Sequence, residues 1–127
     1  PQSSTSQLQR SRSHYAEVVV FLLMSILRNL IDECKKQSEQ LTCAAELVKE
    51  MQNTACKPEL VLLTDPACHG CEEARHSLKP LIQQGIIAEH TWNSKRGRSI
   101  SEKNHISLVP ALLLVDCNNN LLLDINT

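Results

Sequence analysis

Two cysteines separated by two residues, Cys68 and Cys71, have a spacing typical of redox or metal chemistry. The thiolate is the nucleophile in thiol–disulfide exchange, and this spacing lets both sulfurs share one turn of chain. A mixed disulfide on Cys68 can then be resolved by Cys71 without rearrangement of the backbone. His69, between the two, can place a cation beside the thiolate. The pattern predicts Cys68 as the nucleophile and Cys71 as the resolving thiol.

Other uses of this motif are less consistent with the flanking residues. Haem attachment requires a histidine directly after the second cysteine, where this chain has Glu72. A four-thiolate zinc site requires a second Cys-X-X-Cys motif, which the sequence lacks. A metal held by both thiols and a histidine such as His76 remains the less favoured alternative. We therefore expect neither a metal nor a cofactor.

The residues around the pair predict the elements that position it. The continuous apolar run 60–63, closed by Asp65 and Pro66, is typical of a strand buried on both faces, as at the centre of a parallel sheet. An acidic first turn and a helical apolar repeat follow, so a helix begins at or just inside the cysteine pair. Cys68 then lies at a helix N-terminus, where the macrodipole stabilises a thiolate. Pro80 should kink this helix or mark its last turn.

The rest of the chain predicts helices before this unit and strands after it. We expect helices over about 16–36 and 39–53, strands over 86–92, 111–115 and 121–125, and a short helix over 99–105. The polar residues 1–15 are expected to form a disordered arm. The predicted organisation is thus this arm, N-terminal helices over 16–55 and an α/β domain over 56–127.

Residues 58–125 resemble the thioredoxin superfamily. The segment 65–71 (DPACHGC) is similar to the family's active-site loop, and 108–115 (LVPALLLV) is similar to its cis-proline and the strand that follows. The resemblance implies a thioredoxin-like fold, with a central mixed sheet flanked by helices, here preceded by an N-terminal helical extension. It also implies that Pro110, 42 residues after Cys68, is cis and lies beside both sulfurs.

The resemblance assigns roles to further residues of this chain. Cys68, Cys71, His69 and Pro110 would form the catalytic group, while Val109, Pro66 and Gly70 would contact the substrate. Classical thioredoxins carry a buried acid six residues before the first cysteine, where this chain has Leu62. Proton transfer to the resolving thiol must therefore use another group or water. The sequence stops at Thr127, before the final helix that covers one sheet face in the family, so we expect either that the N-terminal helices cover this face instead or that a piece is absent.

These features predict a thiol–disulfide oxidoreductase that contributes to electron transport and cell redox homeostasis. Its partners would be protein disulfides or dithiols and a reductase or thiol donor. The alternative is a non-catalytic thioredoxin-like binding module that holds a metal on the two cysteines or docks a protein partner. The even charge balance, with 13 Lys and Arg against 14 Asp and Glu, gives no indication of nucleic-acid binding.

The other cysteines and the N-terminus predict the compartment. Cys34, Cys43, Cys56 and Cys117 are scattered singly, which favours small buried hydrophobes in a reducing, cytoplasmic setting. The apolar run 18–27 is shorter than the ~20 residues that a membrane span needs. Association with a membrane through residues 16–31, or export through this segment, is the less favoured alternative, and a homodimer through the first helix is a further one.

Overall fold

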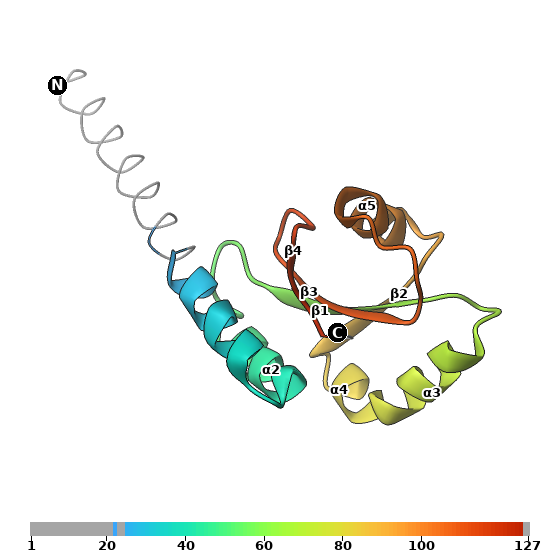
Figure 1. The fold of residues 1–127 in the computed structure, drawn as a ribbon, viewed down its shortest axis with the longest axis horizontal. Helices are drawn as coiled ribbons and strands as arrows, with labels where there is room; N and C mark the ends of the chain where they lie inside the picture. The colour runs from blue at the N-terminus through green and yellow to red at the C-terminus, as the bar shows by residue number, and fades with distance from the viewer. Residues whose placement is uncertain (1–21, 23–24, 126–127) are drawn as a thin grey trace, which may run out of the picture.

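The computed structural model describes residue 22 and residues 25–125 (Figure 1). The expected arm over 1–15 and the start of the first helix lie outside the described residues. Helix 25–36 comes first. The elements that follow are α2 (Gln40–Glu50), β1 (Glu59–Thr64), α3 (His69–Ser77), α4 (Lys79–Gln83), β2 (Ile87–Thr91), α5 (Lys95–Asn104), β3 (Ala111–Val115) and β4 (Leu121–Asp124).

The strands form one four-stranded mixed sheet in the order β2-β1-β3-β4. β1 pairs in parallel with β2 and antiparallel with β3, and β3 pairs antiparallel with β4. The expected parallel partner of β1 is therefore present on one side only. β1 is central, and both its faces are buried, as the continuous apolar run predicted.

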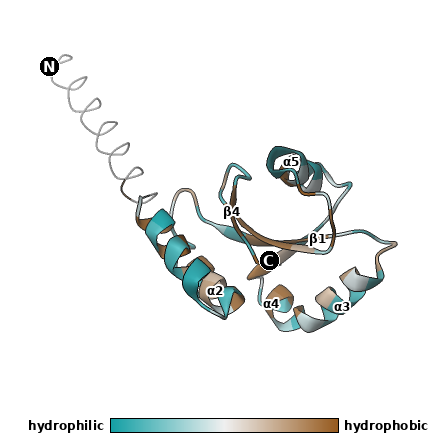
Figure 2. Cartoon of the chain, in the orientation of Figure 1, coloured by the Kyte–Doolittle hydropathy of each residue, from teal (hydrophilic) through white to brown (hydrophobic). Residues whose placement is uncertain are grey.

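Alternate residues of the strands build a core on each face of the sheet. Leu60 and Leu62 point to the face covered by helix 25–36, α2, α3 and α4, while Val61 and Leu63 point to the face covered by α5 (Figure 1). Figure 2 shows that hydrophobic residues concentrate on the strands, whereas α5 is largely hydrophilic. The N-terminal helices thus pack on the same face as the helix that follows the cysteine pair.

Two helices differ from the sequence expectation. The helix expected around Pro80 is split into two: α3 ends at Ser77, and Pro80 lies in the first turn of α4. Proline is tolerated there because the N–H groups of a helix's first turn have no acceptor within the helix. α5 begins at Lys95 rather than Ser99, because the Ser94 hydroxyl caps it by accepting a hydrogen bond from the Gly97 N–H at 3.0 Å.

The prediction that four of the cysteines are unpaired is wrong. Cys34 is bonded to Cys43, and Cys56 to Cys117. The first pair joins the end of helix 25–36 to α2 across the short turn between them. The second follows from strand register: Glu59 pairs with Val115, so the segments before β1 and after β3 meet at the same end of the sheet. Spacing along the chain could not reveal either pairing.

No helix among the described residues is long and apolar enough to cross a membrane.

Candidate functional site

A tight turn leads from β1 into the cysteine pair. The Cys68 N–H donates to the Asp65 carbonyl at 3.1 Å, and the Asp65 carboxylate accepts a hydrogen bond from the Ala67 N–H at 3.2 Å. Asp at the first position and Pro66 at the second are favoured in such turns, because the carboxylate mimics a backbone acceptor and the ring fixes φ. This turn sets Cys68 directly above the carboxyl end of the central strand.

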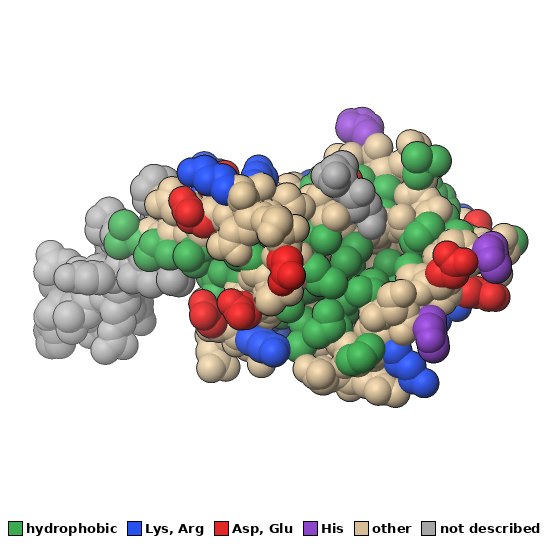
Figure 3. All heavy atoms as spheres, turned by 60° about the horizontal axis from the view of Figure 1, so that its bottom comes forward, with side chains coloured by type: hydrophobic (Ala, Val, Ile, Leu, Met, Phe, Trp, Pro, Cys, Tyr) green, Lys and Arg blue, Asp and Glu red, His purple; other side chains and the backbone are tan. Residues whose placement is uncertain are grey.

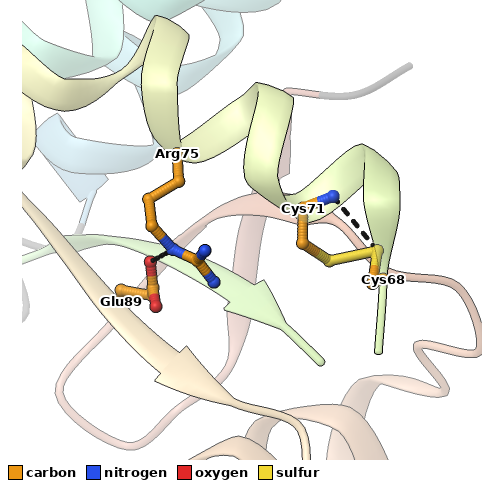
Figure 4. A network of polar contacts seen from close by, with 4 residues as sticks. All are labelled: Cys68, Cys71, Arg75 and Glu89. Atoms are coloured by element: carbon orange, nitrogen blue, oxygen red, sulfur yellow. Dashed lines mark hydrogen bonds and ion pairs between the residues drawn. A yellow bond between two sulfur atoms is a disulfide. The ribbon is translucent and has the colours of Figure 1, made fainter. Parts of the chain in front are cut away.

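Cys68 is the N-cap residue of α3. Its Sγ accepts a hydrogen bond from the Cys71 N–H at 3.1 Å, and it is bonded to the Cys71 Sγ as a disulfide (Figure 4). In the reduced pair, the same N–H and the helix macrodipole face the Cys68 sulfur and favour its thiolate form. Cys71 is fully buried, whereas Cys68 is half-buried. An incoming disulfide can therefore reach Cys68 and not Cys71.

The loop before β3 forms the other wall of the site. The Val109–Pro110 peptide bond is cis, as the resemblance implied. The Cys68 Sγ lies 3.8 Å from the Val109 carbonyl oxygen across a separation of 41 residues. Gly70 lies against the Pro110 ring, because a Cβ on this glycine would come 3.4 Å from the Pro110 Cδ. Two segments far apart in the sequence thus meet at the Cys68 sulfur.

The structure brings together most of the residues expected at the site. Cys68, Cys71, Gly70, Val109 and Pro110 are contiguous, and Pro66 is an exposed part of the turn beside them.

His69 takes a different direction from the one its expected role suggests. Its side chain is 86% exposed and its Nε2 lies 3.5 Å from the Glu73 carboxylate. A charge on this imidazole would therefore be screened by water. Among the residues that the structure describes, no group of three His, Cys, Asp or Glu side chains could hold a metal ion.

The first neighbour of the site that the sequence did not identify is an ion pair. Arg75 on α3 and Glu89 on β2 form an ion pair with an Nε–Oε1 distance of 2.6 Å (Figure 4). The hydrogen bond from Arg75 to Glu89 raises the pKa of the guanidinium above its ordinary value. Arg75 follows Cys71 by four residues, a helical spacing that could have indicated a shared face. Glu89 is placed by strand register, which the sequence does not state.

Leu108 is the second unrecognised neighbour. Its side chain is 80% exposed and directly precedes Val109. This large apolar side chain, one residue before the Val109 carbonyl that faces the Cys68 sulfur, offers a surface that a bound polypeptide could cover. The sequence did not predict this exposure, because Leu108 belongs to an apolar run that continues into β3.

A scan against family models, a search of curated proteins and a search of solved structures each found no significant match.

Proposed function

We propose that the chain is a thioredoxin-like thiol–disulfide oxidoreductase. The observation that carries the proposal is the position of the Cys68 Sγ, which caps α3 and lies 3.8 Å from the Val109 carbonyl of the cis-proline loop. The mixed sheet and the disulfide between Cys68 and Cys71 support the same assignment.

The reaction follows from the difference in burial between the two sulfurs. The Cys68 thiolate attacks a substrate disulfide, forms a mixed disulfide and releases one substrate thiol. Cys71, held in the same turn, then attacks the Cys68 sulfur and releases the second substrate thiol, which leaves Cys68 and Cys71 oxidised. The reverse sequence oxidises a dithiol partner. The exposed Pro66 and the backbone of Val109 flank the path of the incoming polypeptide.

The remaining disulfides bear on where this chemistry takes place. We infer an oxidising compartment, because the bonds Cys34–Cys43 and Cys56–Cys117 lie outside the proposed site and such bonds persist where thiols are not kept reduced. This departs from the cytoplasmic expectation, which assumed that these four thiols were unpaired. The exported alternative takes its place in the proposal.

A redox titration tests the proposed function. The purified chain is equilibrated in glutathione buffers, its free thiols are alkylated, and intact mass with peptide mapping reports which cysteines were reduced. We expect Cys68 and Cys71 to cycle together with a midpoint inside about −120 to −270 mV, the range of related dithiols. The other four cysteines should remain oxidised throughout this range, as structural disulfides do.

Two serine variants separate catalysis from scaffolding. We expect Cys68→Ser to abolish turnover of a protein disulfide, because it removes the nucleophile. Cys71→Ser should instead accumulate a mixed disulfide between Cys68 and the substrate, visible as an added mass that a reductant removes. If both variants keep full partner binding and neither changes a thiol-exchange rate, the binding-module alternative is correct.

A further inference from the structure

An ion pair lies one helical turn beyond the buried sulfur of the site. Arg75 follows Cys71 by four residues, which corresponds to about 6 Å along the axis of α3. Its Nε donates to the Glu89 carboxylate at 2.6 Å. Figure 4 shows the Arg75 side chain extending from α3 toward β2, on the same underside of the helix as the two cysteines.

Strand register places the carboxylate on the same face of the sheet. Glu89 is the parallel partner of Leu62, which belongs to the core on the α3 side of the sheet. Leu62 in turn lies six residues before Cys68, at the strand position where the sequence analysis noted that an acid is missing. The carboxylate on this face is therefore supplied by the neighbouring strand rather than by the central one.

The pair is shielded more than the other charges near the site. The side chains of Arg75 and Glu89 are 43% and 26% exposed. By contrast, Glu72, Glu73, His69 and His76 on α3 and Lys79 on α4 are all exposed, where water and salt screen their effect on a sulfur. Asp65, half-buried in the turn before Cys68, accepts a hydrogen bond from the Ala67 N–H, and its charge is the same in every variant compared below. Water therefore screens the charges of Arg75 and Glu89 less than it screens the exposed charges of α3 and α4.

We propose that Arg75 and Glu89 act as a positioning pair that sets how strongly the thiolates of reduced Cys68 and Cys71 are stabilised, the guanidinium favouring them and the carboxylate offsetting it. This inference rests on the proposed function, because it concerns the redox equilibrium of that same site. It assigns the pair no direct contact with substrate.

The equilibrium that reports this effect is exchange with glutathione. Two glutathione thiols reduce the Cys68–Cys71 disulfide: one S–S bond breaks in the protein, one forms in glutathione disulfide, and two protons pass to the protein's sulfurs or to water. Any charge that stabilises a thiolate stabilises the reduced protein and makes the pair more oxidising. The sign of the shift therefore identifies which charge acts.

The experiment measures this equilibrium constant at pH 8 for charge-removing variants of the full chain. Glu89→Gln leaves Arg75 without its counter-ion, and we expect the equilibrium to move about threefold toward the reduced protein. Arg75→Gln leaves the carboxylate alone, and the equilibrium should move about as far toward the oxidised protein. The double variant should return to within about twofold of the unaltered chain, because both charges are gone.

Two controls distinguish charge from structure. Arg75→Lys with Glu89→Gln keeps a cation on α3 and should retain the shift of Glu89→Gln alone. Glu102→Gln makes the same change in net charge from an exposed position on α5, across the sheet, and should leave the equilibrium unchanged.

The outcome is decided by sign rather than by stability. Loss of the ion pair as a purely structural contact would lower the melting temperature of both single variants and shift the redox equilibrium of both in one direction, or not at all. Either of those redox results overturns the inference. If Glu89→Gln does not fold, the Arg75→Gln variant decides alone. A shift of its redox equilibrium toward the reduced protein, or no shift, then overturns the inference. If instead the unaltered pair does not exchange with glutathione, the proposed function itself has failed.

Discussion

Leu108 is the most exposed of the large hydrophobic side chains in the described structure, at 80%. It precedes Val109, whose carbonyl lies 3.8 Å from the Cys68 sulfur. A side chain this exposed adds little to the stability of the free protein, whereas an apolar residue of a bound polypeptide could bury it. Under the proposed function, Leu108 is a contact that is used only when a substrate is bound.

We therefore expect Leu108→Ser to lower kcat/KM for reduction of a protein disulfide, such as those of insulin, by about fivefold, the loss expected for a buried apolar contact of about 1 kcal/mol. The rate with a small aromatic disulfide should not change, because that reagent needs no polypeptide contact. The melting temperature should stay the same. Both rates are measured on the same preparation.

Leu30→Ser provides the matched control. Leu30 is also an exposed leucine, 39% accessible, but it lies on the N-terminal helix 25–36 rather than beside the cysteine pair. This variant should leave both rates unchanged. Equal losses in the two variants, or a loss with the small disulfide, would contradict a substrate contact at Leu108.

Individual site residues differed in how well the sequence indicated them. Cys68 and Cys71 could be singled out by their two-residue spacing, whereas Pro110 was expected only from the resemblance of 108–115 to a family motif. Glu89 could not be singled out, because a single charged residue in a strand has no meaning until its neighbours across the sheet are known. His69 was identified by type, yet its rotamer turns it toward Glu73.

At the scale of elements, Gly97 fixes how closely α5 approaches β2. The Ser94 N–H and Oγ both donate to the Thr91 carbonyl, at 3.0 and 2.7 Å, and the first turn of α5 folds back over that carbonyl. A Cβ on Gly97 would overlap the Thr91 carbonyl oxygen. The close approach requires a residue without a side chain, and the contact is between two backbones that cannot shift independently.

Gly97→Ala should consequently destabilise the fold by about 3 kcal/mol, despite the better helix propensity of alanine. Urea unfolding of the oxidised protein, followed by circular dichroism, measures the change in free energy. Glu102→Ala, an exposed substitution on the same helix, should change the stability by no more than about 0.5 kcal/mol. A Gly97→Ala variant as stable as this control would show that α5 can move away from β2 at little cost.

Elements with strong local signals were predicted closely. β3 spans the residues expected from its apolar run, and β4 and α2 lie inside their expected bounds. The errors occur where a capping residue or a proline determines the end of a helix. Ser94 starts α5 earlier than the apolar pattern suggests, and Pro80 starts α4 rather than kinking a single helix. A side-chain cap sets the first boundary and a missing backbone N–H the second, and neither depends on hydrophobicity.

At the scale of the whole molecule, an apolar face holds the N-terminal helices to the rest of the fold. Figure 3 shows hydrophobic side chains in a band between these helices and the pair α3 and α4, with charged side chains on the flanking helices. Leu27 and Ile31 of the first helix are buried in the same core as Leu60 and Leu114 of the sheet. The expectation that the N-terminal helices cover this face agrees with that packing.

The long-range disulfide should contribute strongly to stability. The bond between Cys56 and Cys117 closes a loop with a sequence separation of 61, which on chain-entropy grounds is worth about 4 kcal/mol. We expect the variant Cys56→Ala with Cys117→Ala to lose about this much in denaturant unfolding under non-reducing conditions.

The single variants of that disulfide test whether the loss belongs to the bond. Cys56→Ala and Cys117→Ala each break the same crosslink, so each should lose about as much as the double variant. Losses that instead add up would mean that the two side chains contribute separately and that the crosslink itself stabilises little. Peptide mapping of the unaltered chain confirms that the bond is present in the sample.

What could not be predicted at this scale is any property that depends on three-dimensional register. The cysteines were counted correctly, but their partners depend on the pairing of Glu59 with Val115 and on the turn after helix 25–36. The cytoplasmic expectation loses its support with them, since it was drawn from thiols assumed to be unpaired. The interior position of β1, by contrast, followed from its continuous apolar run.

The crosslink between Cys56 and Cys117 also makes most of the domain a covalent ring. Cys68 and Pro110 both lie inside this ring, on opposite sides of β2 and α5 in the chain. A protease that cuts once between them opens the ring without dividing the molecule, so the reactive sulfur and its facing loop stay tethered through the crosslink. After such a cut both parts of the site stay covalently joined for as long as the crosslink is oxidised, and its reduction would leave the two fragments held only by the pairing of β1 with β3 and by the core.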